Sequence, residues 1–294
     1  MKKNIILTGA SGGFGSLIAQ SLLQDGHKVV ATMRDVNGKN QKKSAELKSK
    51  GAHVLEVDVT DDRSVEQGIQ AALRELSSVD VVINNAGIGV LGLQESFTSD
   101  DWKKLFEVNV FGIQRVCRSI LPHMRKKQDG LILNISSLLG RITVPFYGPY
   151  NASKWAVEAM SENYRSELSQ FGVEVCIVEP GGYPTSFIDH MMRPSDRERA
   201  LTYGEFGQMP EGFLKGFEQA LASNPAQDPK NVATAILKVI QAPKGQKPFR
   251  TIVDKMGMGD HIEGYNQQLS QITKGIYTAF GIGHLIDVKL TSKT

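Results

Sequence analysis

The sequence predicts an α/β protein with a Rossmann-like, doubly wound parallel sheet of about seven strands and helices on both faces. Over the first 180 residues, short apolar runs alternate with amphipathic helical stretches, a pattern typical of βαβ units. A glycine-rich segment joins the first apolar run to the first helical stretch. The 294 residues are 40% hydrophobic, and no internal repeat or low-complexity linker divides them. We therefore expect a single domain over residues 1–294.

The expected elements follow one another in regular order. Strands are expected at 4–8, 28–33, 53–57, 80–84, 130–135 and 174–179, with a candidate edge strand at 249–253. Helical patterns lie near 14–25, 39–50, 61–77, 99–127 and 148–170. After Pro180, residues 183–227 mix methionines and phenylalanines with charges, and we expect a lid over the sheet there. Asp228 and Pro229 predict the N-cap and first position of a further helix, and a C-terminal tail with helical stretches begins at about residue 260.

Charge, cysteine and hydropathy patterns exclude several classes of protein. The net charge is +3, and basic residues are interspersed with acidic ones, so we expect no nucleic-acid partner. No apolar run reaches the ~18 residues of a membrane span, and the start has too short an apolar segment for a secretory signal. We expect a cytoplasmic protein. Cys117 and Cys176 lie in apolar stretches and are expected in the core, and His190 is isolated, so no metal site is expected.

The glycine-rich segment predicts a dinucleotide site. Gly9, Gly13 and Gly15 follow the first expected strand in a Gly-x-x-x-Gly-x-Gly spacing, and the same turn holds Ser11, Gly12 and Phe14. Missing side chains let the backbone approach a pyrophosphate, and the helix N-terminus offers free N–H donors. The alternative is a turn needed only for close packing of strand and helix.

A tyrosine and a lysine one helical turn apart predict the reacting centre. Of the seven tyrosines, only Tyr150 has a lysine four residues on, Lys154, which places both side chains on one helix face. The ordinary pKa of tyrosine, about 10, makes it a poor base unless a positive charge favours the phenolate. Ser137 lies thirteen residues upstream of Tyr150 and is favoured over the adjacent Ser136 by that spacing.

With Asn84-Asn85-Ala86-Gly87, Asn109 and Pro180-Gly181 in this order, these motifs resemble the short-chain dehydrogenase/reductase family over about residues 3–190. The resemblance implies hydride transfer between an alcohol and a carbonyl. Tyr150 would exchange the proton, Ser137 would hold the substrate oxygen, Lys154 would also bind the nicotinamide ribose, and Asn109 would anchor a water.

The resemblance also assigns cofactor contacts. Asp58 and Val59 would lie at the adenine ring, although Asp58 has the alternative role of capping the next helix. Asn85, Ala86 and Gly87 would lie beside the adenosine, and Pro180, Gly181 and Thr185 would hold the nicotinamide carboxamide.

The residues after the second expected strand favour NADP over NAD. Met33 occupies the position where an NAD enzyme usually carries an acidic residue, and Arg34 follows. A guanidinium suits a 2′-phosphate. The nearby Lys39, Lys42 and Lys43 either add positive potential for the phosphate or are an ordinary solvated helix face. One alternative to the NADP preference stays open: with the alignment shifted by one residue, Asp35 takes the acidic role.

Apolar residues around the motifs predict a lipophilic substrate and an oligomer. Those expected to line the substrate pocket are Leu138, Leu139, Phe146, Tyr147, Met191, Met192, Phe206 and Phe213. Outward apolar positions on the helices at 99–127 and 148–170, namely Phe111, Val116, Trp155 and Met160, predict a homodimer or homotetramer. A rival interpretation is a catalytically silent NADP-sensing or scaffold protein. An epimerase of a related fold is disfavoured by the glycine spacing.

Overall fold

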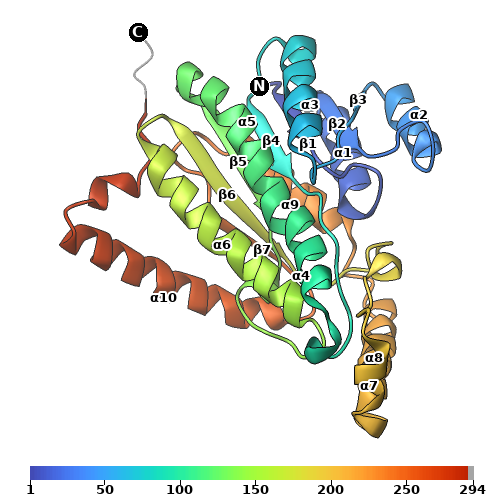
Figure 1. The fold of residues 1–294 in the computed structure, drawn as a ribbon. Coiled ribbons are helices and arrows are strands. Elements are labelled where there is room, and N and C mark those ends of the chain that lie inside the picture. The colour runs from blue at the N-terminus through green and yellow to red at the C-terminus, as the bar shows by residue number, and fades with distance from the viewer. Residues whose placement is uncertain (291–294) are drawn as a thin grey trace.

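The computed structural model describes residues 1–290 and contains a seven-stranded sheet in which every pairing is parallel. The strand order is β3-β2-β1-β4-β5-β6-β7 (Figure 1). The strands are β1 Asn4–Leu7, β2 Lys28–Met33, β3 His53–Glu56, β4 Val81–Asn84, β5 Gly130–Ile135, β6 Val173–Pro180 and β7 Arg250–Val253. The predicted fold class is confirmed, and residues 291–294 of the expected tail lie outside the described residues.

Helices cover both faces of the sheet. They are α1 Gly13–Gln24, α2 Gln41–Ser49, α3 Asp62–Leu76, α4 Ser99–Phe106, α5 Gly112–Lys127, α6 Gly148–Ser169, α7 Arg197–Leu201, α8 Met209–Ala222, α9 Lys230–Gln241 and α10 Met258–Ala279. Successive residues of a strand point to opposite faces. In β1, Ile5 and Leu7 pack with α1 and α9, while Ile6 packs with α3, α5 and α6. Apolar strands are therefore buried on both sides, as a parallel sheet requires.

The expected helix over 99–127 is present as one uninterrupted helical stretch, in which a π-helical turn, η2 Glu107–Phe111, joins α4 to α5. Asn109 lies at the centre of this turn. Its side-chain amide bonds to both backbone groups of Ile88, at 2.9 Å each, in the loop after β4. Such an inserted turn frequently marks a functional site, and here it points an asparagine side chain at the carboxyl edge of the sheet.

Val116 is not an outward residue as expected. It is 1% exposed and packs between α3, α5 and α6. Phe111 and Trp155 are exposed as predicted, and Met160 is half-buried. The error has a physical reason: five residues of a regular helix turn the side chain by about 140°, so Phe111 and Val116 do not share an outward face.

The segments after β6 project from the sheet more than those before it. Residues 183–227, for which the sequence predicts a lid and which we call the lid segment or lid below, contain η4 Ile188–His190, α7, η5 Gly204–Gln208 and α8. Helices α7 and α8 extend away from the sheet (Figure 1). The carboxylate of Asp228 accepts from the N–H of Lys230 at 2.9 Å. Helix α9 begins at Lys230 with Pro229 as its N-cap and no side-chain cap, so the predicted cap and first position lie one residue too early. The tail is one 22-residue helix, α10.

Cys117 and Cys176 are free and buried, as predicted. Burial raises the pKa of each thiol to about 12. Across residues 1–290, no helix is long and apolar enough to cross a membrane. Within the same residues, no group of His, Cys, Asp and Glu side chains is placed to hold a metal ion.

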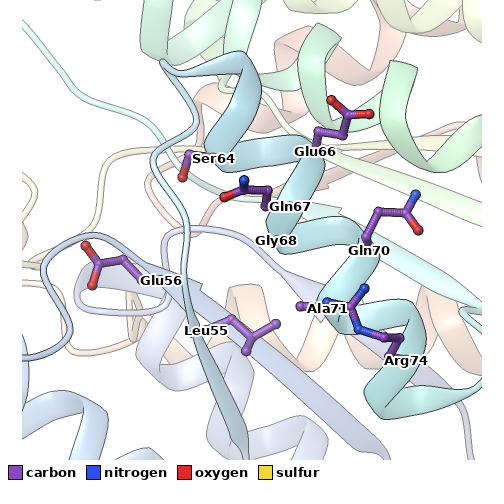
Figure 2. A pocket seen from close by; sticks show the side chains of 9 residues that line it. All are labelled: Leu55, Glu56, Ser64, Glu66, Gln67, Gly68, Gln70, Ala71 and Arg74. Atoms are coloured by element: carbon purple, nitrogen blue, oxygen red, sulfur yellow. The ribbon is translucent and has the colours of Figure 1, made fainter.

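A hollow of about 670 Å³ lies at the edge of the sheet, where α3 leaves β3 partly uncovered. Figure 2 shows its lining, which includes Leu55, Glu56, Gly68 and Arg74. None of the motif residues takes part in this lining. The hollow is therefore a surface feature of the sheet edge, separate from the site described below.

Candidate active site

The glycine-rich turn lies between β1 and α1, against the loop after β4. Gly9 has a left-handed φ of 67°, and a Cβ atom there would lie 2.7 Å from the Cα of Ala86. A Cβ on Gly15 would lie 2.1 Å from the carbonyl oxygen of Gly9. Close packing alone requires these two glycines. Gly12 and Gly13 are different, because a Cβ there would meet only Ser186 or Thr185, at 3.3 and 4.0 Å.

The N-terminus of α1 fits an anionic ligand. Its N-cap, Gly12, provides no side-chain cap, and the first turn contains no acidic residue. The N–H of Gly13 donates only a long hydrogen bond, 3.4 Å, to Ser186 Oγ. Ser11 and Phe14, in the same turn, are half-buried. Uncapped N–H groups at the positive end of a helix suit a pyrophosphate, so these residues fit a dinucleotide cofactor.

Arg34 is the exposed cation beside this turn. Its Nη1 lies 3.8 Å from Oδ2 of Asp58. The carboxylate of Asp35 already accepts the Lys39 N–H at 2.8 Å within its own loop. Met33 is 2% exposed and packs in the core. Among the three residues in question, Arg34 has the side chain best placed to meet a ligand phosphate.

Asp58 and Val59 follow β3 at the same edge of the sheet. Oδ1 of Asp58 accepts from the N–H and hydroxyl of Thr60, at 2.9 and 2.8 Å. Asp61 caps α3 by accepting the Ser64 N–H at 2.6 Å. The alternative of Asp58 as the cap of this helix is therefore wrong. Val59 is buried.

The loop after β4 is fixed by hydrogen bonds from its neighbours. Thr8 Oγ1 accepts the N–H groups of Asn85 and Ala86, both at 3.1 Å. Asn85 Nδ2 donates to the carbonyls of Thr8 and Gly9, both at 3.0 Å. A Cβ on Gly87 would lie 3.9 Å from Lys154 Nζ. The Asn85 amide therefore ties the loop after β4 to the end of β1.

Ser137, Tyr150 and Lys154 come together at the carboxyl edge of β5 and β6. Ser137 Oγ accepts the Leu139 N–H at 3.1 Å and lies 3.4 Å from the carbonyl oxygen of Pro180. Lys154 Nζ lies 5.6 Å from the ring centre of Tyr150 and donates to the Ile135 carbonyl at 2.8 Å. The three predicted residues are thus neighbours on two elements, the end of β5 and the first turns of α6.

Burial dominates the protonation of this group. It raises the pKa of Tyr150, and the Ser137 hydroxyl opposes this shift. Burial also lowers the pKa of Lys154 to about 8, against the charge of Glu158 one turn further along α6. A low dielectric disfavours both charged forms. The free protein therefore holds a neutral phenol beside a lysine whose charge is easily changed.

Asn109 reaches the same place from the π-helical turn. Its Nδ2 donates to Ser153 Oγ at 3.1 Å, in addition to its bonds with Ile88. Oδ1 lies 3.4 Å from the position of a Cβ on Gly87. Asn109 thus joins the loop after β4 to the helix that carries Tyr150 and Lys154.

The segment after β6 closes over the glycine-rich turn. The Gly181 N–H donates to Val253 at 2.9 Å, which fixes the loop to β7. Tyr183 packs edge-on against Phe14 of the glycine-rich turn, with ring centres 5.5 Å apart. Thr185 Oγ1 accepts the Phe187 N–H at 3.4 Å. Phe187 in turn packs edge-on against Tyr150, with ring centres 5.9 Å apart.

This site has counterparts in known proteins. The sequence profile of the short chain dehydrogenases matches residues 3–195. The chain belongs to the short-chain dehydrogenase/reductase family. It is 36% identical over 251 residues to 3-ketodihydrosphingosine reductase of Bacteroides thetaiotaomicron, which covers 85% of this chain and 87% of that protein. It is 32% identical over 250 residues to bovine retinol dehydrogenase 8, covering 81% and 78% of the two chains.

Solved structures of the family share the architecture. A short-chain dehydrogenase from Streptomyces avermitilis aligns with a TM-score of 0.74 and 28% identity, covering 96% of this chain and 98% of that one. A Burkholderia phymatum enzyme in complex with NAD gives 0.71 and 26%, covering 85% and 89%. A metagenomic oxidoreductase in complex with NADP gives 0.65 and 25%, covering 85% and 96%. The protein is thus an oxidoreductase of this family, whose members bind nicotinamide cofactors and act on CH–OH groups.

The lid of this short-chain dehydrogenase/reductase is attached by its first half. Met192 exchanges backbone hydrogen bonds with Gly89 and Leu91, at 2.9 and 3.0 Å. The carboxylate of Asp101 accepts the N–H of Ser195 at 3.0 Å. Arg199 pairs with Glu95 at 2.7 Å. These contacts hold α7 against the segment before α4.

Aromatic side chains connect the second half of the lid to the helix of Tyr150. Phe146 has a left-handed φ of 72°, an outlier for a bulky residue. Its ring centre lies 6.1 Å from that of Phe206 and 5.8 Å from that of Phe213. Phe213 also packs against Tyr147 at 6.2 Å.

Four of the apolar residues expected to line a pocket, Leu139, Phe146, Met191 and Met192, belong to the two apolar clusters that contain Tyr150, whereas Leu138 and Tyr147 are buried. Leu138 is 1% exposed and packs in the interior. Met192 is half-buried beside Val90, whereas Phe206 and Phe213 are 49% and 41% exposed. His190 is exposed, as expected for an isolated surface histidine.

Sequence reasoning missed one group of charged residues behind the site. Arg141, Glu158, Glu179 and Arg250 are all buried or nearly so and lie next to one another. A partial signal was present, because Glu158 stands one turn after Lys154 on a helix face otherwise occupied by buried residues. The pairing partners are far away in the sequence, which is why the group emerges only in the folded chain.

Proposed function

We propose that this oxidoreductase interconverts a lipophilic alcohol and its ketone or aldehyde with NADP(H). The observation that carries the proposal is the convergence of Ser137, Tyr150 and Lys154 beside the uncapped N-terminus of α1. The nicotinamide cofactor would supply or accept the hydride. The chain's own residues would bind, orient and move the proton.

In the reduction direction, Tyr150 would donate its phenolic proton to the oxygen of the carbonyl substrate. Ser137 would donate a hydrogen bond to the same oxygen and fix its position. Lys154, one turn from Tyr150, would favour the resulting phenolate when it is protonated. Asn109 would keep the lysine environment in place and, as the family resemblance implies, anchor a water there.

The remaining predicted residues would hold the cofactor. The pyrophosphate would lie at the turn containing Gly9, Ser11, Gly12, Gly13, Phe14 and Gly15. The adenine would lie near Asp58 and Val59, the adenosine along Asn85, Ala86 and Gly87, and the carboxamide at Pro180, Gly181 and Thr185. The bond between Asp35 and Lys39 leaves Arg34 as the residue that favours NADP.

The lid supports a lipophilic substrate. Phe146, Phe206 and Phe213 form an aromatic contact group next to the start of α6, the helix that carries Tyr150, and such surfaces suit apolar ligands. The relatives named above act, by their names, on a ketodihydrosphingosine and on retinol. Both are lipophilic molecules, and we extend that substrate class to this protein.

The test is NADPH oxidation by the purified protein against a panel of ketones, aldehydes and quinones that runs from short and polar to long and apolar. We expect faster turnover of the long apolar carbonyls with NADPH than with NADH. No turnover of any member, together with tight NADPH binding, would support the rival silent cofactor-sensing protein.

We further propose that the protein works as a single-domain homodimer or homotetramer in the cytoplasm. Phe111 on η2 and Trp155 on α6 are exposed large apolar residues on neighbouring elements, and exposed apolar surface often marks an interface. Light scattering at micromolar concentration should give a mass of two or four chains. A monomeric mass would contradict the proposal.

A further inference from the structure

Three segments of the candidate site each send one charged side chain into the same buried cluster. Arg141 follows the loop of Ser137, Glu158 is one turn beyond Lys154, and Glu179 immediately precedes Pro180. All three are buried. The cluster therefore lies directly behind the residues proposed to react.

The charged groups of this cluster contact one another at short range. Arg250 Nε, from β7, lies 3.0 Å from Glu158 Oε2 and 3.3 Å from Glu179 Oε1. Arg141 Nη1 lies 3.7 Å from Glu158 Oε2. Glu162, at the rim on α6, pairs with the other end of Arg250. The carboxylates of Glu158 and Glu179 thus share the guanidinium of Arg250. Burial, together with the negative charge of Glu158, raises the pKa of Glu179 to about 8.

Packing makes this cluster stiff. A Cβ on Gly140 would lie 2.7 Å from Ser136 Oγ and 3.1 Å from both Glu158 Cγ and the Lys154 carbonyl oxygen. The Ser137 loop therefore rests on the Lys154–Glu158 turn with no space between them. A displacement of Arg141 or Glu158 would move the backbone that carries the site.

Helix α10 completes the cluster through one amide. Asn266 Oδ1 accepts from Arg141 Nε at 2.9 Å, and Asn266 Nδ2 donates to Glu179 Oε2 at 2.7 Å. The ring of Tyr265, its neighbour on α10, lies 4.7 Å from the Arg141 guanidinium carbon. Asn266 is one of the few buried residues of α10, and it joins the Ser137 side of the site to the Pro180 side.

We propose that Asn266 is a positioning residue for hydride transfer: by bridging Arg141 and Glu179, it sets the Ser137 loop against the Pro180 loop and makes α10 a part of the active site. This inference rests on the proposed function. A buried charge left without its partner is costly, so loss of the amide would force Arg141 and Glu179 to find new positions. An asparagine suits the task because it both accepts and donates in one plane.

The first test replaces Asn266 with leucine, which removes both hydrogen bonds and keeps the number and branching of the side-chain heavy atoms. We expect kcat to fall by on the order of 10- to 100-fold with little change in KM, because a misplacement of about 1 Å can cost 10²-fold. The matched control is Gln268→Leu, on the exposed side of the same helix. Only protein that is folded by circular dichroism is compared, and a wild-type kcat in Asn266→Leu would overturn the proposal.

The second test is Asn266→Asp, which keeps the shape and changes one donor into an acceptor. The aspartate still accepts from Arg141 but reaches Glu179 favourably only when the two carboxyls share a proton. Its kcat should therefore approach wild type at low pH and fall more steeply than wild type as pH rises. The groups facing this pair are Arg141, Glu158, Glu162, Arg250 and Tyr265. A profile parallel to that of wild type would overturn the proposal.

Hydrogen–deuterium exchange separates this inference from the proposed function. In Asn266→Leu, peptides covering residues 136–142 and 180–187 should exchange faster than in wild type and in Gln268→Leu. If the wild type reduces no carbonyl, the proposed function fails. The exchange measurement alone then tests whether Asn266 positions the Ser137 and Pro180 loops. Unchanged exchange in both peptides would show that α10 does not position the site.

Discussion

The reacting centre and the lid meet at Tyr150, but different interactions hold them in place. Around the centre, Asn109 and Lys154 are buried and hydrogen-bonded to backbone carbonyls and N–H groups of neighbouring segments. In the lid, Phe206 and Phe213 are largely exposed, and the ion pairs of Arg193 and Arg199 lie at the surface. Buried polar bonds are costly to break, whereas surface ion pairs contribute about 0–1 kcal/mol each.

This difference in the interactions predicts different functions for the reacting centre and the lid. The centre has one arrangement, because each displaced polar group would leave a partner unsatisfied. The lid has aromatic contacts and weak ion pairs that allow several arrangements. We therefore expect substitutions in the centre to change the rate strongly for every substrate, and substitutions in the lid to change the choice of substrate mildly.

The largest effect is expected at Tyr150. Tyr150→Phe removes the proposed acid and keeps the ring, so turnover should fall at least the ~100-fold typical of a lost acid/base group. NADPH affinity, measured by fluorescence titration, should change little. Tyr164→Phe, on the same helix, serves as the control. If Tyr150→Phe turned over substrate as fast as Tyr164→Phe, Tyr150 would not be the proton donor, and the expected difference between the reacting centre and the lid would be contradicted.

The next effect concerns Arg34, at the cofactor end of the centre. Arg34→Ala should raise the dissociation constant of NADPH by roughly 10- to 100-fold and leave that of NADH nearly unchanged, since a charge-assisted phosphate contact is worth about 1.5–3 kcal/mol. Lys48→Ala, an exposed lysine in the last turn of α2, is the matched control. If the ratio of the NADPH and NADH dissociation constants were unchanged in Arg34→Ala, then Asp35 or the nearby lysines would determine the cofactor preference.

The lid gives a smaller and more selective effect. Phe213→Ala should raise KM for a long apolar carbonyl about three- to tenfold, the range of one lost aromatic contact, and leave KM for a short one unchanged. Phe171→Ala is a suitable control, because both phenylalanines are 41% exposed and Phe171 lies beyond the end of α6. Equal losses for short and long substrates would mean that Phe213 supports the fold and not the pocket.

The smallest effect is a pH dependence of stability that comes from Lys154. Its pKa is about 8 in the folded protein and 10.5 ordinarily, so between these values the unfolded chain holds a proton that the folded one lacks. Stability contributed by Lys154 therefore rises with pH in this window. Urea unfolding should show wild type gaining about 1 kcal/mol relative to Lys154→Met between pH 8 and 9. A constant difference would mean that the lysine is not desolvated as the structure shows it.

The features that the sequence predicts correctly depend on residues close together in the chain, and the features that it misses depend on contacts between distant segments. The strands, the glycine-rich turn and the one-turn spacing of Tyr150 and Lys154 are local patterns, and the structure shows all of them where expected. The π-helical turn at Asn109 was not predicted, because it depends on a bond to Ile88, which lies in another element. Val116, five residues after the exposed Phe111, faces the core and not the outer surface as predicted.

The buried cluster behind the site shows the same limit. Arg141 and Asn266 are 125 residues apart in the sequence, and nothing local marks either as a partner of the other. The helical stretches of the C-terminal tail were predicted, but the contact of α10 with this cluster was not. A charged residue on an otherwise buried helix face, such as Glu158, indicates that a buried partner of opposite charge exists. It does not indicate which residue that partner is.

The two buried cysteines make it practical to measure the position of the lid relative to α10 with dyes. Cys117 and Cys176 are the two cysteines of the chain, and a thiol with a pKa of about 12 is almost entirely in its unreactive protonated form at neutral pH. Maleimide dyes should therefore leave the folded wild type unlabelled. One cysteine introduced on α8 and another on α10 would give a dye pair without background, and energy transfer between the dyes would report how far the lid moves relative to the helix behind the site.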